Sequence, residues 1–159
     1  LEKLSQLLIE VSGRAGRNNN HAKVIIQTRY PEDINLNKIK TGDYMNFANQ
    51  CLTTNAKLNL PPFSTICLLR CSSPTQISNN IFLERALSIL SNRKEINVIG
   101  PLPSLISKSK GSYRHHLFIQ TSSKPYLNKV LKYLTNEFQK WPETKKIKWS
   151  FDIDPMNIN

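Results

Sequence analysis

Two arginines three residues apart are the side chains of this sequence best suited to nucleotide chemistry. They belong to the segment Val11-Ser-Gly-Arg-Ala-Gly-Arg17, in which Gly13 precedes Arg14 and Gly16 precedes Arg17. Glycine lets the backbone turn tightly and leaves the neighbouring guanidinium groups unshielded. A guanidinium keeps its charge and presents a planar fork, which suits the γ-phosphate of a nucleotide and the charge that develops during its transfer. A helix C-terminus with solvated arginines remains the open alternative for this segment.

The last third of the chain carries most of a net charge of +11. Between Lys108 and Lys148 there are ten Lys or Arg residues against two acids, Glu137 and Glu143. Localised positive charge favours a polyanion, either nucleic acid or an acidic peptide, and a lysine-rich surface without a partner is the alternative. A basic hairpin with adjacent aromatic rings suits phosphate contact and stacking on an unpaired base. The candidate DNA-binding residues are therefore Lys108, Lys110, Tyr113, Arg114, Lys145, Lys146 and Lys148.

Lys124 is a separate candidate, for docking of an anion or a protein partner. It follows Ser122-Ser123 at the start of an expected helix, where free backbone N–H groups and the helix dipole favour an anion. That anion is either a DNA phosphate or a peptide carboxylate, such as the acidic C-terminus of a single-strand DNA-binding protein. Charge alone does not separate the two.

The other titratable residues predict structure rather than catalysis. His115 and His116 are adjacent on an expected strand, so they face opposite ways and cannot bind one metal ion together. We expect one to be buried and the other exposed. Asp152 and Asp154 share a strand face and are expected to be caps or salt-bridge partners. The cysteine spacing lacks the ligand pairs of a zinc site, so no metal site is predicted. Buried, reduced thiols are expected at Cys51, Cys67 and Cys71.

The elements that must position these residues differ between residues 1–60 and 61–159. In the first part, apolar spacing predicts a helix that Gly13 breaks, a short buried strand over Ala22–Thr28, and helical turns over about 36–58 that Gly42 and Asp43 split. Pro61-Pro62 ends this part, because proline cannot continue a helix. No apolar run reaches the roughly 20 residues of a membrane span.

Residues 61–159 are predicted to form one α+β domain. Strands are expected over 63–71, over 98–101 with 105–109, over 113–121 and over 147–153, and helices over 77–90 and 124–141. The turn at Lys110-Gly111-Ser112 is expected to close a hairpin. The resulting order, β-α-β-β-α-β, is that of the split βαβ, or ferredoxin-like, arrangement.

Separated motifs that occur in a fixed order resemble one family. The segment Gly13-Arg-Ala-Gly-Arg17 resembles motif VI of superfamily-two helicases. The chain as a whole resembles primosomal protein N′, the PriA-type replication-restart DNA helicases. The resemblance implies that residues 1–60 end a second, RecA-like helicase lobe and that residues 61–159 are a C-terminal domain that binds DNA and protein. The further motifs that carry it are Val24-Ile-Ile-Gln-Thr28, the Pro31 turn, Leu60-Pro-Pro-Phe63, Gly100-Pro-Leu-Pro103 and Trp149-x-x-Asp152-x-Asp154-Pro155.

The resemblance also implies an activity for the parent protein. We expect an ATP-driven 3′-to-5′ DNA helicase that binds stalled replication forks and initiates primosome assembly, in the bacterial cytoplasm and associated with the nucleoid. Gly13, Arg14, Gly16 and Arg17 would bind the nucleotide, with Arg14 and Arg17 catalytic and Arg17 as the arginine finger. The implied cofactors are ATP, Mg²⁺ and zinc. The implied partners are fork DNA, single-stranded DNA, the single-strand DNA-binding protein and other primosome proteins, with no membrane.

Two departures from the family limit what this chain is expected to do alone. The family has Gln three residues before the first motif glycine, where this sequence has Glu10, and an acid there repels a nucleotide unless it points away. The sequence has no Walker-type loop, no acidic Mg²⁺-binding box and no cluster of zinc ligands. With a first residue of Leu1, these absences predict a fragment that does not hydrolyse ATP by itself. The alternatives are a stand-alone module for an acidic peptide and a helicase remnant without function.

Overall fold

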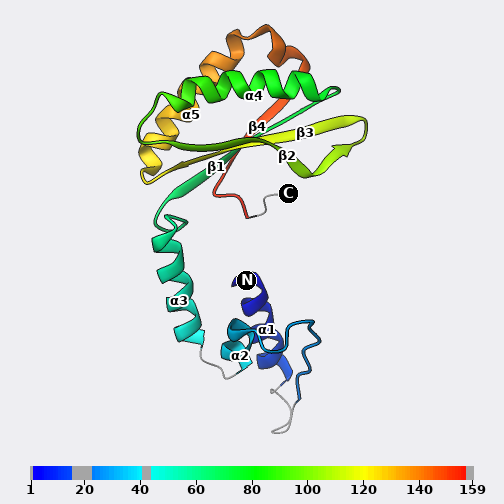
Figure 1. Ribbon diagram of the computed structural model, residues 1–159, viewed down its shortest axis with the longest axis vertical. Coiled ribbons are helices and arrows are strands. Elements are labelled where there is room, and N and C mark those ends of the chain that lie inside the picture. The colour runs from blue at the N-terminus through cyan, green and yellow to red at the C-terminus, as the bar shows by residue number, and fades with distance from the viewer. Residues whose placement is uncertain (1, 16–22, 41–43, 157–159) are drawn as a thin grey trace. The chain divides into compact units, whose positions relative to one another are not determined.

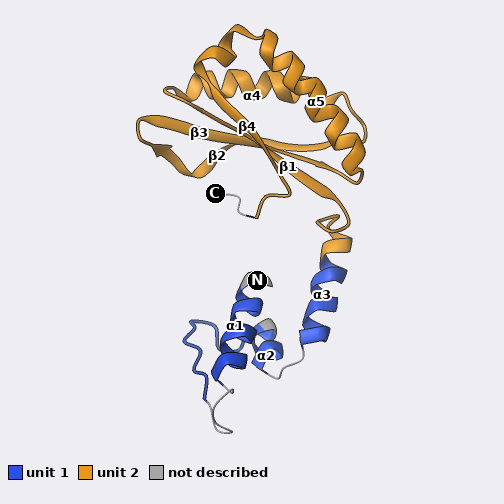
Figure 2. Cartoon of the chain, turned by 180° about the vertical axis from the view of Figure 1, so that it is seen from behind, with its two compact units in different colours: residues 1–54 blue, residues 55–159 orange. Residues whose placement is uncertain are grey.

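The computed structural model describes residues 2–15, 23–40 and 44–156, and the chain divides into two compact units, residues 1–54 and 55–159 (Figure 2). Unit 1 contains α1 (Glu2–Ala15), α2 (Ile34–Lys40) and most of α3 (Tyr44–Lys57). Unit 2 begins in the last turn of α3 and contains the remaining elements. The division therefore falls a few residues before Pro61-Pro62, where the sequence pattern changes.

Unit 1 differs from the sequence prediction at two places. The predicted break at Gly13 is wrong, because α1 continues to Ala15. A single glycine inside a helix costs only about 1 kcal/mol relative to alanine, which the rest of the helix can absorb. The predicted strand over Ala22–Thr28 is also wrong, since residues 23–28 are not in a strand. An isolated strand is not stable without a paired neighbour, and the described part of unit 1 contains none.

The predicted helices of unit 1 are confirmed in α2 and α3, whereas Gly42 and Asp43 lie outside the described residues. The N-terminus of α2 is capped by Asp33, whose Oδ1 accepts a hydrogen bond from the backbone N–H of Leu36 at 3.1 Å. A carboxylate at this position satisfies one of the free N–H groups of the first turn. Leu36 and Phe47 are the buried apolar residues among those described in unit 1.

Unit 2 has the predicted order of elements (Figure 1). The four strands form one antiparallel sheet in the order β2-β3-β1-β4, which confirms the predicted split βαβ arrangement. The observed bounds lie within a few residues of the predicted ones. The elements are β1 (Thr65–Ser73), α4 (Gln76–Ser91), β2 (Asn97–Ser109), β3 (Ser112–Thr121), α5 (Lys124–Lys140), the 3-10 helix η1 (Pro142–Lys146) and β4 (Lys148–Ile153).

Helices α4 and α5 lie together on one face of the sheet (Figure 1). Both begin at a hydroxyl cap, since Thr75 accepts from the N–H of Ser78 and Ser123 accepts from the N–H of Tyr126. Their inner sides and alternate residues of β1 and β3 form one buried core, whose members include Cys67, Leu69, Phe82, Leu90, Leu117, Ile119, Leu134 and Phe138. Because side chains alternate across a strand, the intervening residues of β1 point to the face without helices.

Strand β2 departs twice from regular pairing with β3. At the first irregularity Gly100 has φ of +119°, and a Cβ atom there would meet the carbonyl oxygen of His116 at 3.0 Å. Only glycine combines that backbone angle with so close a neighbour. At the second, Pro103 pairs with His115 and Lys108 with Tyr113, so residues 104–107 stand opposite Arg114 alone. We call residues 104–107 the β2 bulge.

Candidate nucleic-acid interface

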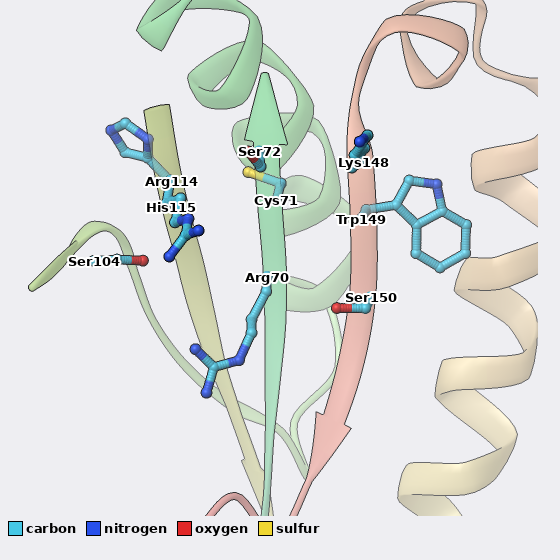
Figure 3. A pocket seen from close by; sticks show the side chains of 9 residues that line it. All are labelled: Arg70, Cys71, Ser72, Ser104, Arg114, His115, Lys148, Trp149 and Ser150. Atoms are coloured by element: carbon cyan, nitrogen blue, oxygen red, sulfur yellow. The ribbon is translucent and has the colours of Figure 1, made fainter. Parts of the chain in front are cut away.

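Three neighbouring strands place cationic side chains around one hollow of the sheet (Figure 3). In the register of β1, Ser72 lies between Arg114 of β3 and Lys148 of β4. Two residues earlier in β1, Arg70 lies beside Ser150 of β4. These five residues alternate with the core residues of their strands, so they share the face of the sheet that carries no helix. We call the space of about 390 Å³ that they help to line the basic hollow.

The basic hollow holds more positive than negative charge. Arg70 donates from Nη2 and Nε to Oδ2 of Asp152, at 2.9 and 3.2 Å. Across the described ranges, neither Arg114 nor Lys148 forms an ion pair, and both are exposed. Two cations with no carboxylate partner, together with the hydroxyl groups of Ser72 and Ser150, suit an anion such as phosphate.

The two adjacent histidines are buried, and His115 is among the residues that line the basic hollow. His116 Nδ1 lies 3.3 Å from Oγ of Ser104 in the β2 bulge, and His115 Nδ1 lies 3.2 Å from Nδ2 of Asn79 in α4. The histidines face opposite sides as predicted, but the expectation that one would be exposed is wrong, because both are buried. The β2 bulge covers one ring and α4 covers the other. Burial lowers the pKa of both, and Arg70 and His115 lower the pKa of His116 further, so neither adds charge at neutral pH.

The predicted DNA-binding residues fall into three groups in the structure. Arg114 and Lys148 meet at the basic hollow. Lys108 and Lys110 lie at the β2–β3 hairpin, whose turn residues Lys110 and Gly111 have φ of 48° and 77°. Lys108 Nζ lies 5.0 Å from the centre of the Tyr113 ring, so these two predicted residues are in contact. Lys145 and Lys146 are exposed in η1, directly before β4.

Sequence reasoning missed Arg70, which lines the basic hollow from β1, the strand between β3 and β4. Its signal is its position, since a charged residue interrupts the apolar run of β1 and is followed two residues later by Ser72. Polar residues at alternate positions of a buried strand indicate a second, solvent-accessible face. Ser104 and Ser150 gave no such signal, because serine is common in turns and strand ends alike.

Lys124 begins α5 as predicted, but its ammonium group is already engaged within the chain. Its Nζ donates to Oδ2 of Asp154 at 3.0 Å. Burial alone would raise the pKa of Asp154, but hydrogen bonds from Lys124, Thr65 and the N–H of Ile66 lower it. Asp152 and Asp154 are therefore salt-bridge partners, as predicted.

The nucleotide-binding candidates of unit 1 lie at the end of α1. Gly13 and Arg14 are helical, and the guanidinium of Arg14 forms an ion pair with the carboxylate of Glu10 one turn earlier. Gly16 and Arg17 lie outside the described residues. The acid that departs from the family motif is thus bound to the first motif arginine.

The cysteines are free, and two of them are inert. Burial raises the pKa of Cys67 and of Cys71 to about 12, so both thiols are protonated at neutral pH. They are buried as predicted, whereas Cys51 is only half-buried. The described residues contain no group of three or more His, Cys, Asp or Glu side chains that would hold a metal ion. The zinc implied by the family resemblance therefore has no fitting site among them.

Helices of the length and apolarity needed to cross a membrane do not occur in the described part of the chain. The fold and the basic hollow together define an α+β domain of split βαβ order that presents a cationic strand face. Residues 56–156 match the family of the primosomal protein N C-terminal domain. The chain belongs to this family, which confirms the resemblance seen in the sequence.

Three relatives share the name "Replication restart protein PriA". The protein of Haemophilus influenzae is 32% identical over 165 residues, covering 99% of this chain and 22% of that protein. The protein of Rickettsia prowazekii is 34% identical over 154 residues, with 97% and 23% covered. The protein of Bacillus subtilis is 29% identical over 156 residues, with 97% and 19% covered. The chain thus spans less than a quarter of the length of each of these relatives.

Proposed function

We propose that this chain is the C-terminal part of a replication-restart DNA helicase and that unit 2 binds DNA through the basic hollow and the β2–β3 hairpin. The observation that carries the proposal is the convergence of Arg70, Arg114 and Lys148 from three adjacent strands on one hollow. Relatives named for replication restart, with which almost the whole chain aligns, support the same assignment. Such a protein acts on DNA in the bacterial cytoplasm, at the nucleoid.

Phosphate contact explains this arrangement better than a solvated surface does. Arg70 has a carboxylate partner in Asp152, whereas Arg114 and Lys148 form no ion pair with any described residue, so an anion bound between these two cations would offset their mutual repulsion. Arg114 and Lys148 flank the same residue of β1. A DNA backbone that crosses the strands at this point would neutralise both cations and accept hydrogen bonds from the serine hydroxyl groups.

The test is binding of labelled DNA, followed by fluorescence anisotropy between about 50 and 200 mM salt. The variant Arg114→Ala/Lys148→Ala is expected to weaken binding to every DNA and to reduce the slope of log affinity against log salt by about 1 to 2. The control Lys129→Ala/Lys132→Ala removes the same charge from exposed positions of α5 and is expected to change the slope much less. Equal losses in both variants would show that only net charge matters.

Recognition of forks is a finer part of the proposal. Forked, duplex and single-stranded DNA of equal length are compared at one salt concentration, and the fork is expected to bind most tightly. Equal, weak binding of all three would remove structure-selective recognition and leave a general DNA-binding surface. The hairpin variant Lys108→Ala/Lys110→Ala, read against the same control, shows whether the hairpin belongs to that surface.

A second function, docking of an acidic peptide, has its own observation. Lys124 already binds a carboxylate, that of Asp154, at the edge of the sheet. The acidic C-terminus of a single-strand DNA-binding protein would exchange with Asp154 as the partner of the same ammonium group. Titration of a labelled acidic peptide against the chain and against Lys124→Ala tests this. Equal affinity for both proteins would exclude Lys124 from a docking site.

ATP hydrolysis is proposed only for the parent protein. There Gly13, Arg14, Gly16 and Arg17 would contact the nucleotide phosphates, with Arg17 as arginine finger and Mg²⁺ held by residues outside this chain. Replacement of Arg17 by alanine in the full-length protein is expected to lower kcat for ATP more than its KM, as loss of a transition-state contact does. The isolated chain is expected to show no ATPase activity in the same assay.

A further inference from the structure

The β2 bulge presents two large aliphatic side chains to solvent. Leu105 is 82% exposed and Ile106 is 61% exposed. Figures 1 and 2 both show β2 bending away from the helix layer near its hairpin end. Ser104, the first residue of the bulge, is buried and lies against His116, so the bulge is attached to the sheet at its base. The bulge holds these two adjacent aliphatic side chains out in solvent. Their exposure needs an explanation, because burial of each side chain would have stabilised the fold.

Two cations are neighbours of this aliphatic pair in the sheet. Arg114 is the residue of β3 that stands opposite the bulge, and Lys108 follows it along β2. The Lys108 ammonium group lies 5.0 Å from the centre of the Tyr113 ring. In the sequence, no acidic residue occurs between Glu95 and Glu137. The occupant of this surface therefore has both an apolar face and negative charge close to it.

We propose that Leu105 and Ile106 contact the face of an unpaired base where single-stranded DNA leaves a duplex. This inference rests on the proposed function, since it adds a base contact to the phosphate contacts of the basic hollow. A nucleotide combines a flat apolar base with a phosphate a few ångströms away, which matches an aliphatic pair framed by lysine and arginine. Proteins that bind distorted DNA insert leucine or isoleucine side chains against unstacked bases in the same way.

A paired duplex offers no partner for the side chains of Leu105 and Ile106. Its base faces are stacked on one another, so only its ends, mismatches and junctions offer a face to an aliphatic side chain. A peptide made only of acidic residues satisfies the cations but gives the two exposed aliphatic residues no partner. The geometry thus favours a junction nucleotide over both alternatives, and this contact would supply the preference for forks.

The test measures two forms of the protein on two forms of the DNA. Fork DNA is prepared with the first unpaired nucleotide intact or abasic, and binding is measured for the unaltered chain and for Leu105→Ser/Ile106→Ser. The unaltered chain is expected to lose about fivefold in affinity on the abasic fork. The serine variant is expected to bind the intact fork about fivefold more weakly and not to distinguish the two forks. Its salt slope and its affinity for plain duplex are expected to stay unchanged, because the phosphate contacts remain.

The control Leu58→Ser/Phe63→Ser removes two other exposed apolar side chains of unit 2, before the start of β1. It is expected to lose the same fivefold on the abasic fork as the unaltered chain does. A serine variant that still distinguishes the forks, or that loses affinity for duplex equally, would overturn the base contact and leave DNA binding intact. Absence of DNA binding by the unaltered chain would remove the proposed function as well. Loss of acidic-peptide binding with unchanged fork binding would assign the bulge to a protein partner instead.

Discussion

The two units of this chain have similar helical patterns in sequence but differ in how those helices are covered. In unit 2, the apolar side of α5 is buried through Leu127, Leu134 and Phe138. In unit 1, α1 has an equally regular apolar side, yet Leu4 and Leu7 are exposed. Periodicity therefore predicts which residues form a helix, but a stable core depends on whether the chain supplies another surface to cover the helix.

The largest expected difference between the units is the effect of removing a buried phenylalanine from each. In unit 2, the ring of Phe138 packs against Phe82 and Trp141, each with a centroid separation of 4.8 Å. Phe138→Ala is expected to lower the free energy of unfolding of unit 2 by about 3–5 kcal/mol. Phe47→Ala is expected to cost less, since its aromatic neighbour among the described residues is Tyr44, at a centroid separation of 6.4 Å.

Urea unfolding gives the total change, and hydrogen exchange read by peptide assigns it to one unit. The control is Leu7→Ala, at an exposed position of α1, which is expected to change stability by less than about 0.5 kcal/mol. Similar losses for Phe47→Ala and Phe138→Ala would mean that unit 1 has a core as well packed as that of unit 2.

A smaller effect on stability is expected at Gly100, where the backbone conformation, rather than the packing of a side chain, is what a substitution would disturb. Gly100→Ala places a Cβ atom near the His116 carbonyl oxygen and requires an L-residue at φ of +119°. We expect a loss of about 1–3 kcal/mol in the free energy of unfolding. Gly111→Ala is the matched control, because its φ is +77° but nothing lies within 4 Å of the added atom. Equal losses at both positions would attribute the effect to backbone angle alone.

The fold of unit 2 was predictable from sequence because each element has its own local signal. Alternation marked β3, helical spacing marked α5, and Gly111 marked the turn between β2 and β3. The same local rules failed over Ala22–Thr28, where an apolar segment has strand composition but no partner within the described chain. Strand formation depends on pairing, which a local pattern does not contain.

The candidate site was less predictable than the fold. Lys108, Lys110 and Arg114 were predicted as one group through their charge, but the structure places Arg114 at the basic hollow and Lys108 and Lys110 at the β2–β3 hairpin. The basic hollow, however, depends on the pairing of β1 with β4, which sets Arg70 beside Ser150, 80 positions later in the sequence. A local sequence pattern does not reveal that register. The burial of both histidines likewise depends on the β2 bulge and on α4, which no local pattern connects to them.

The histidines provide a pH test that acts on unit 2. Burial lowers the pKa of His115 and His116 from the ordinary value of 6.5. The unfolded chain therefore binds more protons than the folded one as the pH falls through 6.5 toward the lowered values, so stability is complete above this range and is lost below it. The thermal midpoint of unit 2 is expected to fall between pH 7 and pH 5.5, and to fall less in His115→Gln/His116→Gln. An identical pH dependence in the variant would show that other groups cause the loss.

The smallest effect is expected for the ion pair of α1. Glu10 and Arg14 are one helical turn apart and both are exposed, and such pairs contribute about 0.3–0.5 kcal/mol. Glu10→Gln is therefore expected to raise amide exchange slightly in α1 and to leave unit 2 unchanged. Asp152→Asn, which breaks the less exposed pair with Arg70, is the matched change in unit 2 and is expected to have the larger effect. A larger effect in α1 would mean that the pair stabilises unit 1 beyond its own helix, in a unit whose described residues bury few apolar side chains. Without such an effect, the main consequence of Glu10 is chemical, because its carboxylate forms an ion pair with Arg14, one of the two arginines proposed to contact the nucleotide.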